Sequence, residues 1–115
     1  MIPTGKTIIR ASDYGTTELS IQEWRRCRAV IGPVQRIEVS KAALDRDATM
    51  IIEGREACLL LSGANAGYAG EGPHGSERIL LEAGVPKDQA KAVFECEHVT
   101  FIRDEGGWTH VRWNK

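Results

Sequence analysis

The sequence predicts an α+β fold: a single domain over residues 1–115, with a five- or six-stranded, mainly antiparallel sheet and one longer and two short helices packed mostly on one face. Segments with strand character outnumber those with helical spacing, and neighbouring pairs of them are joined by short turns that contain glycine. Such pairs form hairpins, which are antiparallel. The helical segments are largely grouped apart from the strands, so they should cover one side of the sheet.

Composition is that of an ordinary globular protein. Hydrophobic residues make up 42% and charged residues 27%, a balance that argues against intrinsic disorder. The net charge of −1 gives no support to nucleic-acid binding, which favours clearly basic domains. No apolar run is long enough to span a membrane, and the first residues lack the apolar core of a signal peptide. We therefore expect a cytoplasmic protein without a membrane partner.

The cysteines indicate free thiols rather than disulfides or metal ligands. Cys27, Cys58 and Cys96 are odd in number and lie in apolar or strand-like segments, as buried thiols in a reducing compartment do. No Cys-x-x-Cys or His-x-x-His pair is present, which argues against a structural zinc site. Cys96 and His98 would share one face of a strand, but two ligands do not make a metal site. We expect neither a metal nor a cofactor.

The first elements are a strand at residues 7–11 and a turn at residues 12–15, where Ser, Asp and Gly suit a tight bend. A longer helix follows. Ser20 and Glu23 have the spacing of a capping box, so this helix should begin at Ser20, and Gly32 should end it. The apolar stripe of the helix consists of Ile21, Trp24, Cys27 and Ile31.

Three further strands are expected at residues 34–40, 49–53 and 56–61, with a loop or a single helical turn at residues 41–47. The last two of these strands should form a hairpin, because Gly54 and Arg55 suit a two-residue type II′ turn. Residues 59–61 are three leucines without alternation, which is typical of a strand buried in the middle of a sheet.

The C-terminal half should hold two short helices and a second hairpin. Ser76 is expected to cap a helix that ends at Gly84, and residues 87–94 should form the next helix. The strands of the hairpin are expected at residues 98–103 and 108–113. Their turn sequence, Asp-Glu-Gly-Gly, would pair Arg103 with Trp108. Both faces of this hairpin then carry apolar side chains, so one face could meet a helix and the other a partner.

The most unusual stretch is a glycine-rich loop that precedes the helix at Ser76. Five of the twelve glycines fall within residues 63–75, a density typical of backbone with positive φ or with a close neighbour. Loops held by a rigid scaffold often carry function. The candidate binding residues in or beside this loop are Asn65, Tyr68, Glu71, His74 and Ser76. The alternative is that the glycines only let the loop fold over the sheet, with Tyr68 as a lid.

Residues 70–75, Gly-Glu-Gly-Pro-His-Gly, match the G-x-G-x-x-G spacing of dinucleotide-binding folds. Eight residues separate the preceding strand from the first of these glycines, and that strand belongs to a hairpin rather than a βαβ unit, so a dinucleotide site is disfavoured. A looser anion site stays open, in which the free amides of Gly75, Ser76 and Glu77 bind phosphate. His74 beside Ser76 is a candidate general base, although a single loop histidine is more often a surface residue.

Two classes of function follow. The first is a small soluble non-enzymatic binding protein that acts through protein–protein contact, such as an inhibitor or immunity-type protein that covers a partner's active site. Besides the glycine-rich loop, its possible partner surface is Arg25, Arg26 and Trp113. The two arginines could equally form a solvated basic face that complements the helix dipole. The second class is a phosphate- or nucleotide-binding domain, with or without catalysis, that holds an anionic small molecule at the loop and the helix start at Ser76. We favour the first class and assign no catalytic residue.

Overall fold

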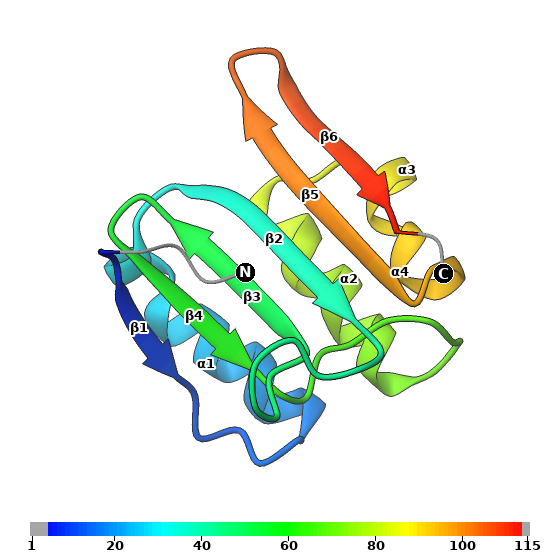
Figure 1. Cartoon of the computed structure of the whole chain (residues 1–115), viewed down its shortest axis with the longest axis horizontal. Coiled ribbons are helices and arrows are strands. Elements are labelled where there is room, and N and C mark those ends of the chain that lie inside the picture. Colours follow the sequence, from blue (N-terminus) through cyan, green and yellow to red (C-terminus); the bar gives the residue numbers. More distant parts are fainter. Residues whose placement is uncertain (1–4, 114–115) are drawn as a thin grey trace.

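The computed structural model describes residues 5–113. Its strands form one six-stranded sheet with the spatial order β1-β4-β3-β2-β5-β6 (Figure 1). They are β1 (Thr7–Arg10), β2 (Val34–Ser40), β3 (Met50–Gly54), β4 (Ala57–Leu61), β5 (His98–Asp104) and β6 (Gly107–Arg112). Among these strands only β1 and β4 pair in parallel, and the other neighbours are antiparallel. The predicted α+β class and strand number are confirmed, and the parallel edge pair makes the sheet mixed.

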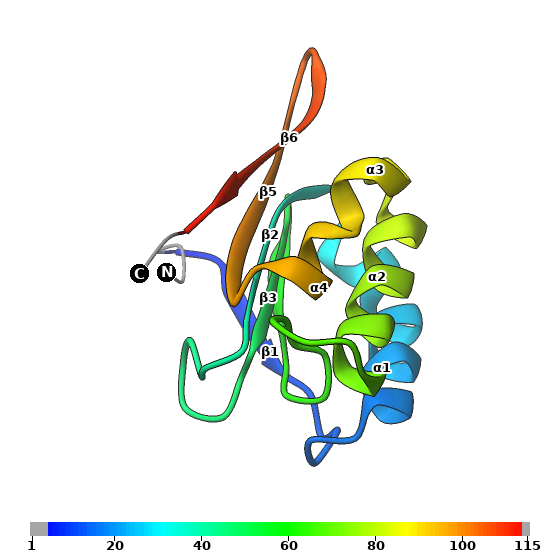
Figure 2. The ribbon, with the colours of Figure 1, turned by 90° about the vertical axis from the view of Figure 1, so that its right-hand side faces the viewer.

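The helices lie together on one face of this sheet, so the molecule has two layers (Figure 2). They are α1 (Thr17–Ile31), α2 (Glu71–Ala83), α3 (Lys87–Ala90) and α4 (Ala92–Glu95). The first two pack side by side, with α1 against β4, and α4 packs against β5. The segment predicted as one helix at residues 87–94 is thus two short helices that meet at Lys91.

The main core fills the space between the helices and the sheet. Its largest fully buried side chains are Trp24, Phe101, Ile31, Ile37, Met50, Ile52, Leu59, Leu61, Ile79 and Leu80. Alternation along the strands turns the strand residues of this set toward the helices. Trp24 also donates its indole N–H to Glu82 Oε1 at 2.9 Å, which joins α1 to α2. The predicted apolar face of the first helix is therefore part of the core.

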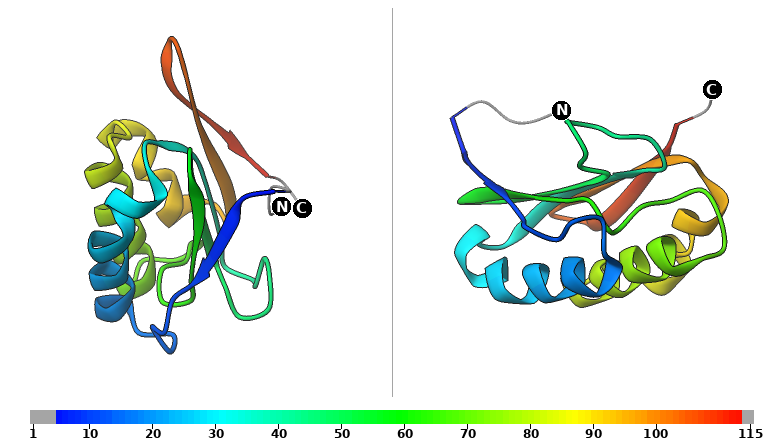
Figure 3. Two further views of the ribbon diagram at one scale, coloured as in Figure 1. Left: turned by 90° about the vertical axis from the view of Figure 1, so that its left-hand side faces the viewer. Right: turned by 90° about the horizontal axis from the view of Figure 1, so that it is seen from below.

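The opposite face of the sheet is covered at one end by the loop between β2 and β3, which folds back over the strands (Figure 3). Leu44 and Ala48 of this loop pack against Ile51, Cys58 and Leu60 in a second apolar cluster. This explains why β4 is buried on both faces, as its run of leucines predicts. The tip of the β5–β6 hairpin points away from this loop, and β6 forms the edge of the sheet opposite β1 (Figure 1).

The start of the first helix differs from the prediction. The helix begins at Thr17, with Thr16 at the N-cap and no side chain capping it, so Ser20 lies inside the first turn and the capping box does not form. Ser20 is buried and its hydroxyl donates to Asp13 Oδ2 at 2.6 Å. Glu23 instead accepts from Arg26. A tertiary partner for Ser20 has replaced the local one that the spacing suggested.

The start of the second helix also differs. It begins at Glu71 with Gly70 at the N-cap, so Ser76 lies in its second turn rather than at its start. Pro73 fits the first turn of a helix, where a backbone N–H has no intrahelical acceptor. The end agrees with the prediction: Gly84 adopts the left-handed conformation and its N–H donates to Leu81 O at 3.1 Å. The irregular part of the glycine-rich segment is therefore shorter than predicted.

Of the two hairpins, the C-terminal one has the predicted register, with Arg103 opposite Trp108. In the other hairpin Glu53 pairs with Cys58, so Gly54 still belongs to β3 and the turn lies one residue later than predicted. Gly54 is needed for a different reason. A Cβ atom on it would lie 2.1 Å from the carbonyl oxygen of Ile31, because the end of α1 rests on this strand.

We expect Gly54→Ala to lower the free energy of unfolding by about 2 kcal/mol, because the added methyl group meets backbone atoms that cannot rotate away. Gly106→Ala is the matched control, since a Cβ atom there would lie 3.4 Å from its nearest neighbour, an ordinary contact. Urea denaturation of both variants measures the difference. Equal midpoints for the two would show that the end of α1 can move away from β3.

Candidate functional site

The loop that joins β4 to α2, residues 62–70, is fixed at its start by a buried carboxylate. Asp13 is 1% exposed. Its carboxylate accepts hydrogen bonds from the backbone N–H of Ser62 at 2.7 Å and of Gly63 at 3.3 Å, and from the hydroxyls of Ser20 and Ser62. The N–H of Gly63 also donates to Ser20 Oγ at 2.9 Å. The protein's own carboxylate thus occupies the donors that an external anion would need at this end of the loop.

The glycines of the G-x-G-x-x-G stretch allow close packing around the start of α2. A Cβ atom on Gly70 would lie 2.5 Å from the ring of Tyr68, and one on Gly72 would lie 1.9 Å from Asn65 Oδ1. A Cβ atom on Gly75 would lie 2.3 Å from the methyl carbon of Thr17 on α1. These glycines therefore allow the start of α2 to pack closely against its own loop and against α1. The amides of residues 75–77 lie within the helix rather than at its start, so they are not the free amides on which the predicted anion site depends.

The five loop residues predicted as a binding site fall into two groups. Asn65, Tyr68 and Ser76 take part in the packing of the loop, and Ser76 Oγ donates to the Asn65 carbonyl at 2.7 Å. Asn65 Oδ1 is buried and has no hydrogen-bond partner within residues 5–113. Glu71 and His74 are exposed on α2 and line a hollow of about 230 Å3 between α1 and α2. The His74 ring also packs edge-on against the Phe94 ring, with the two centroids 4.7 Å apart.

The three residues predicted as a partner surface do not lie together. Arg25 and Arg26 are on α1, in the helical layer, and each is bound to a carboxylate: Arg25 to Glu82 at 2.5 Å and Arg26 to Glu23 at 2.7 Å. The hydrogen bond from Arg25 holds the pKa of Glu82 below its ordinary value, although burial opposes this. Trp113 follows β6, at the other edge of the molecule.

Trp113 lies on the side of the β5–β6 hairpin that faces away from the helices. Its indole N–H donates to Thr100 Oγ1 at 2.9 Å, and its ring stacks on His98 with the centroids 5.4 Å apart. Two further large apolar side chains, Ile102 and Val111, lie on the same side. We call Ile102, Val111 and Trp113 the outer face of the hairpin. They are 37%, 44% and 48% exposed, and Val111 sits opposite Thr100, diagonal to Ile102.

Beneath the outer face lies a histidine–carboxylate pair. His98 Nε2 is 2.6 Å from Glu38 Oε2, and Glu38 is only 7% exposed. Burial would raise the pKa of Glu38, but hydrogen bonding to its carboxylate, which includes the bond with His98, holds that pKa below its ordinary value. The pair fixes the imidazole on which Trp113 stacks. Next to it, a hollow of about 640 Å3 is lined by Ser40, Lys41, Ala42, Ala43, Leu44, Glu97 and His98.

Sequence reasoning gave both faces of the hairpin apolar side chains without deciding which one is the outer face, and it missed the pair below that face. The register of the hairpin placed Ile102, Val111 and Trp113 on one side, but which side meets the helices depends on α2 and α4, which pack from elsewhere in the sequence. The sequence gives no signal that singles out Glu38. It stands at the polar position of the alternation between Ile37 and Val39, where a solvent-facing residue is expected.

The cysteines are free, as predicted, with Cys27 and Cys58 buried and Cys96 half-buried. Burial raises the pKa of the Cys27 and Cys58 thiols, which makes them poor nucleophiles. Among residues 5–113, no group of three or more His, Cys, Asp or Glu side chains is arranged to hold a metal ion. No helix in that range has both the length and the apolar character needed to cross a membrane.

Comparisons of the chain with protein-family models, curated proteins and solved structures give no match.

Proposed function

We propose that the protein is a small non-enzymatic binding protein that contacts a partner protein through the outer face of the β5–β6 hairpin. The observation that carries this proposal is the exposure of Ile102, Val111 and Trp113 side by side on one surface. Contiguous apolar patches on a protein surface are typical of interaction sites. Tryptophan is also among the residues that contribute most to the binding energy of such interfaces.

The arrangement of Trp113 supports a preformed contact. Its indole is held by the hydrogen bond to Thr100 and by stacking on His98, whose own ring is bound to Glu38. A large side chain that is already fixed loses less conformational entropy on binding than a mobile one. The exposed part of the indole can therefore insert into a pocket of the partner at low cost.

An inhibitor or immunity-type role, in which this face covers the active site of a partner enzyme, is the form of the proposal that we favour. A hairpin at the edge of a small domain can reach into a concave surface (Figure 1). The glycine-rich loop is not part of the proposed surface, because its buried residues hold α1, α2 and β4 together.

The test is capture of the partner by wild-type protein, Trp113→Ala and Val30→Ala from the host extract, with quantitative mass spectrometry. Val30 is 62% exposed on α1 and serves as the matched control for loss of a surface apolar group. We expect one partner in stoichiometric amount with wild type and with Val30→Ala. Loss of the tryptophan should weaken binding by about 30-fold or more, which corresponds to about 2 kcal/mol.

Equal capture by Trp113→Ala and wild type would reject the outer face as the interface. Sedimentation analysis of the purified protein adds a second check. Self-association that disappears in Trp113→Ala would mean that the outer face joins two copies of this chain, and the proposal of a different partner protein would then fail.

A further inference from the structure

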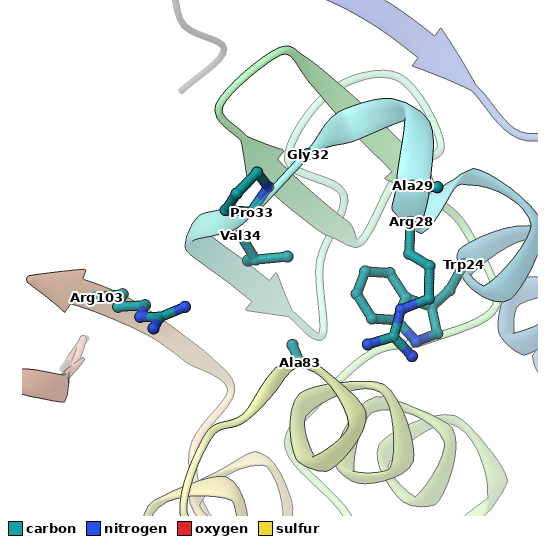
Figure 4. A pocket seen from close by; sticks show the side chains of 8 residues that line it. All are labelled: Trp24, Arg28, Ala29, Gly32, Pro33, Val34, Ala83 and Arg103. Atoms are coloured by element: carbon teal, nitrogen blue, oxygen red, sulfur yellow. The ribbon is translucent and has the colours of Figure 1, made fainter.

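A groove on the helix side of the sheet lies close to the tip of the β5–β6 hairpin. It consists of two adjoining hollows of about 400 and 440 Å3, which share Pro33, Val34 and Arg103 as lining residues. The first hollow extends to Ala83 at the end of α2, and the second extends to Arg55 in the β3–β4 turn. Figure 4 shows the guanidinium group of Arg103 directed from β5 toward the opening between Val34 and Ala83.

Two arginines of this groove lack a protein partner. Within residues 5–113, the guanidinium groups of Arg55 and Arg103 form no hydrogen bond or ion pair. Most other arginines do have a carboxylate within 4.0 Å: Arg10, Arg25, Arg26, Arg28, Arg36 and Arg112. Two guanidinium groups without a hydrogen-bonded partner line the same hollow and offer ten N–H donors, which suit a carboxylate or a phosphate.

The charges around the groove decide where an anion would sit. The C-terminal ends of α1 and α2 border the first hollow, and their carbonyl groups disfavour an anion there. Arg28 already has partners beside the first hollow: it donates to the Glu82 carbonyl at 3.0 Å, and its guanidinium carbon lies 4.8 Å from the centre of the Trp24 ring. The acidic residues Asp104 and Glu105 also line the second hollow. These two carboxylates offset the formal charge of Arg55 and Arg103, so an anion in this hollow would be held by hydrogen bonds from the two guanidinium groups rather than by net charge.

The first hollow offers apolar contact instead of charge. Pro33, Val34 and Ala83 contribute aliphatic surface beside the shared arginine (Figure 4). Each hollow falls in the size range of small-molecule sites. A ligand that fills both hollows therefore needs a charged head group in the second hollow and a compact apolar body in the first. The two parts must be close together, because Arg103 lines both hollows.

We propose that this groove binds a small organic anion, with a carboxylate or phosphate head held by Arg55 and Arg103 and an apolar body against Pro33 and Val34. The site is separate from the proposed protein-binding surface. Arg103 points to the same side of β5 as the buried Phe101, whereas Ile102 belongs to the outer face. The inference therefore does not depend on the proposed function.

The test uses phenyl phosphate and benzoate as probes, with inorganic phosphate as the head group alone, in a titration followed by backbone amide chemical shifts. We expect both aromatic anions to shift amides around residues 33–35, 55 and 103–105, and to bind more tightly than inorganic phosphate. Arg55→Ala and Arg103→Ala should each weaken binding about 10-fold or more, because each removes hydrogen bonds to a charged group. Arg78→Ala is the matched control, an exposed arginine on α2 outside this groove.

Both groove arginines are exposed, so the variants should fold, and their thermal midpoints should match that of Arg78→Ala. Shifts that map elsewhere, or equal weakening in all three variants, would overturn the site. Binding of inorganic phosphate as tightly as phenyl phosphate would reject the apolar half of the proposal. An effect with phenyl phosphate but none with benzoate would identify phosphate as the head group that the site accepts.

Discussion

Replacing Trp24 with alanine is expected to lower the free energy of unfolding by about 3–5 kcal/mol. The side chain is fully buried at the junction of α1, α2 and the sheet, and it is the largest group of the main core. Its removal leaves a cavity that the neighbouring elements cannot fill without moving. Its removal also takes away the indole N–H that donates to the Glu82 carboxylate, which then keeps its hydrogen bonds from Arg25.

Urea denaturation measures this loss, and two further variants separate its causes. Trp24→Phe keeps much of the ring volume but lacks the donor to Glu82, so we expect it to lose about 1–2 kcal/mol. Val30→Ala on the exposed side of the same helix should change stability by less than about 0.5 kcal/mol. A Trp24→Ala protein within about 1 kcal/mol of wild type would mean that α1 does not pack on the sheet as described.

Removing the carboxylate of Asp13 should be comparably severe. In Asp13→Ala the hydroxyls of Ser20 and Ser62 and the N–H of Ser62 lose their shared acceptor, and the N–H of Gly63 keeps only Ser20 Oγ. Each unsatisfied buried donor costs about 1–3 kcal/mol, so the total should be about 3 kcal/mol or more. The loss should be felt where the β1–α1 loop, α1 and the loop after β4 meet, since Asp13 belongs to the first of these and its carboxylate binds the other two.

The measurement is denaturation combined with hydrogen exchange of the Ser62 and Gly63 amides, which should exchange much faster in the variant. Asp104→Ala is a fair control, because Asp104 is exposed and accepts one hydrogen bond, from the N–H of Gly106. Asp13→Asn keeps an acceptor oxygen but brings an NH2 group against other donors, so it should lie between wild type and Asp13→Ala. Unchanged exchange in Asp13→Ala would show that water replaces the carboxylate without cost.

The parts of the fold that depend on neighbouring residues could be predicted from the sequence. The register of the β5–β6 hairpin follows from its alternation and its turn residues, and the end of α2 follows from Gly84. The helix starts could not be predicted in this way. Ser20 and Ser76 have the local signature of N-caps, but their hydroxyls bond to Asp13 and to the Asn65 carbonyl instead. A partner from another segment outweighs the local one, and spacing alone does not reveal it.

The glycine-rich segment illustrates the same limit for the site. A density of glycine indicates close approach, and this proves correct at Gly72 and Gly75, but the neighbours are Asn65 and Thr17 rather than a ligand. Which group approaches a glycine is a property of the packed chain. Likewise, the lack of an acidic partner for Arg55 and Arg103 follows from where the carboxylates lie in the folded chain, and the sequence does not give those positions.

The parallel pairing of β1 with β4 has a consequence for the order in which the molecule can assemble on the ribosome. Each residue of β1 pairs with one fifty positions later, as Ile8 does with Cys58. The first strand therefore leaves the ribosome well before the strand that will hold it. The β2–β3–β4 meander connects neighbours in sequence and can form as it emerges. During synthesis the central strands β2, β3 and β4 can thus form first and act as a template. β1, although made earlier, then pairs with β4 on one side, and the β5–β6 hairpin, made last, pairs with β2 on the other.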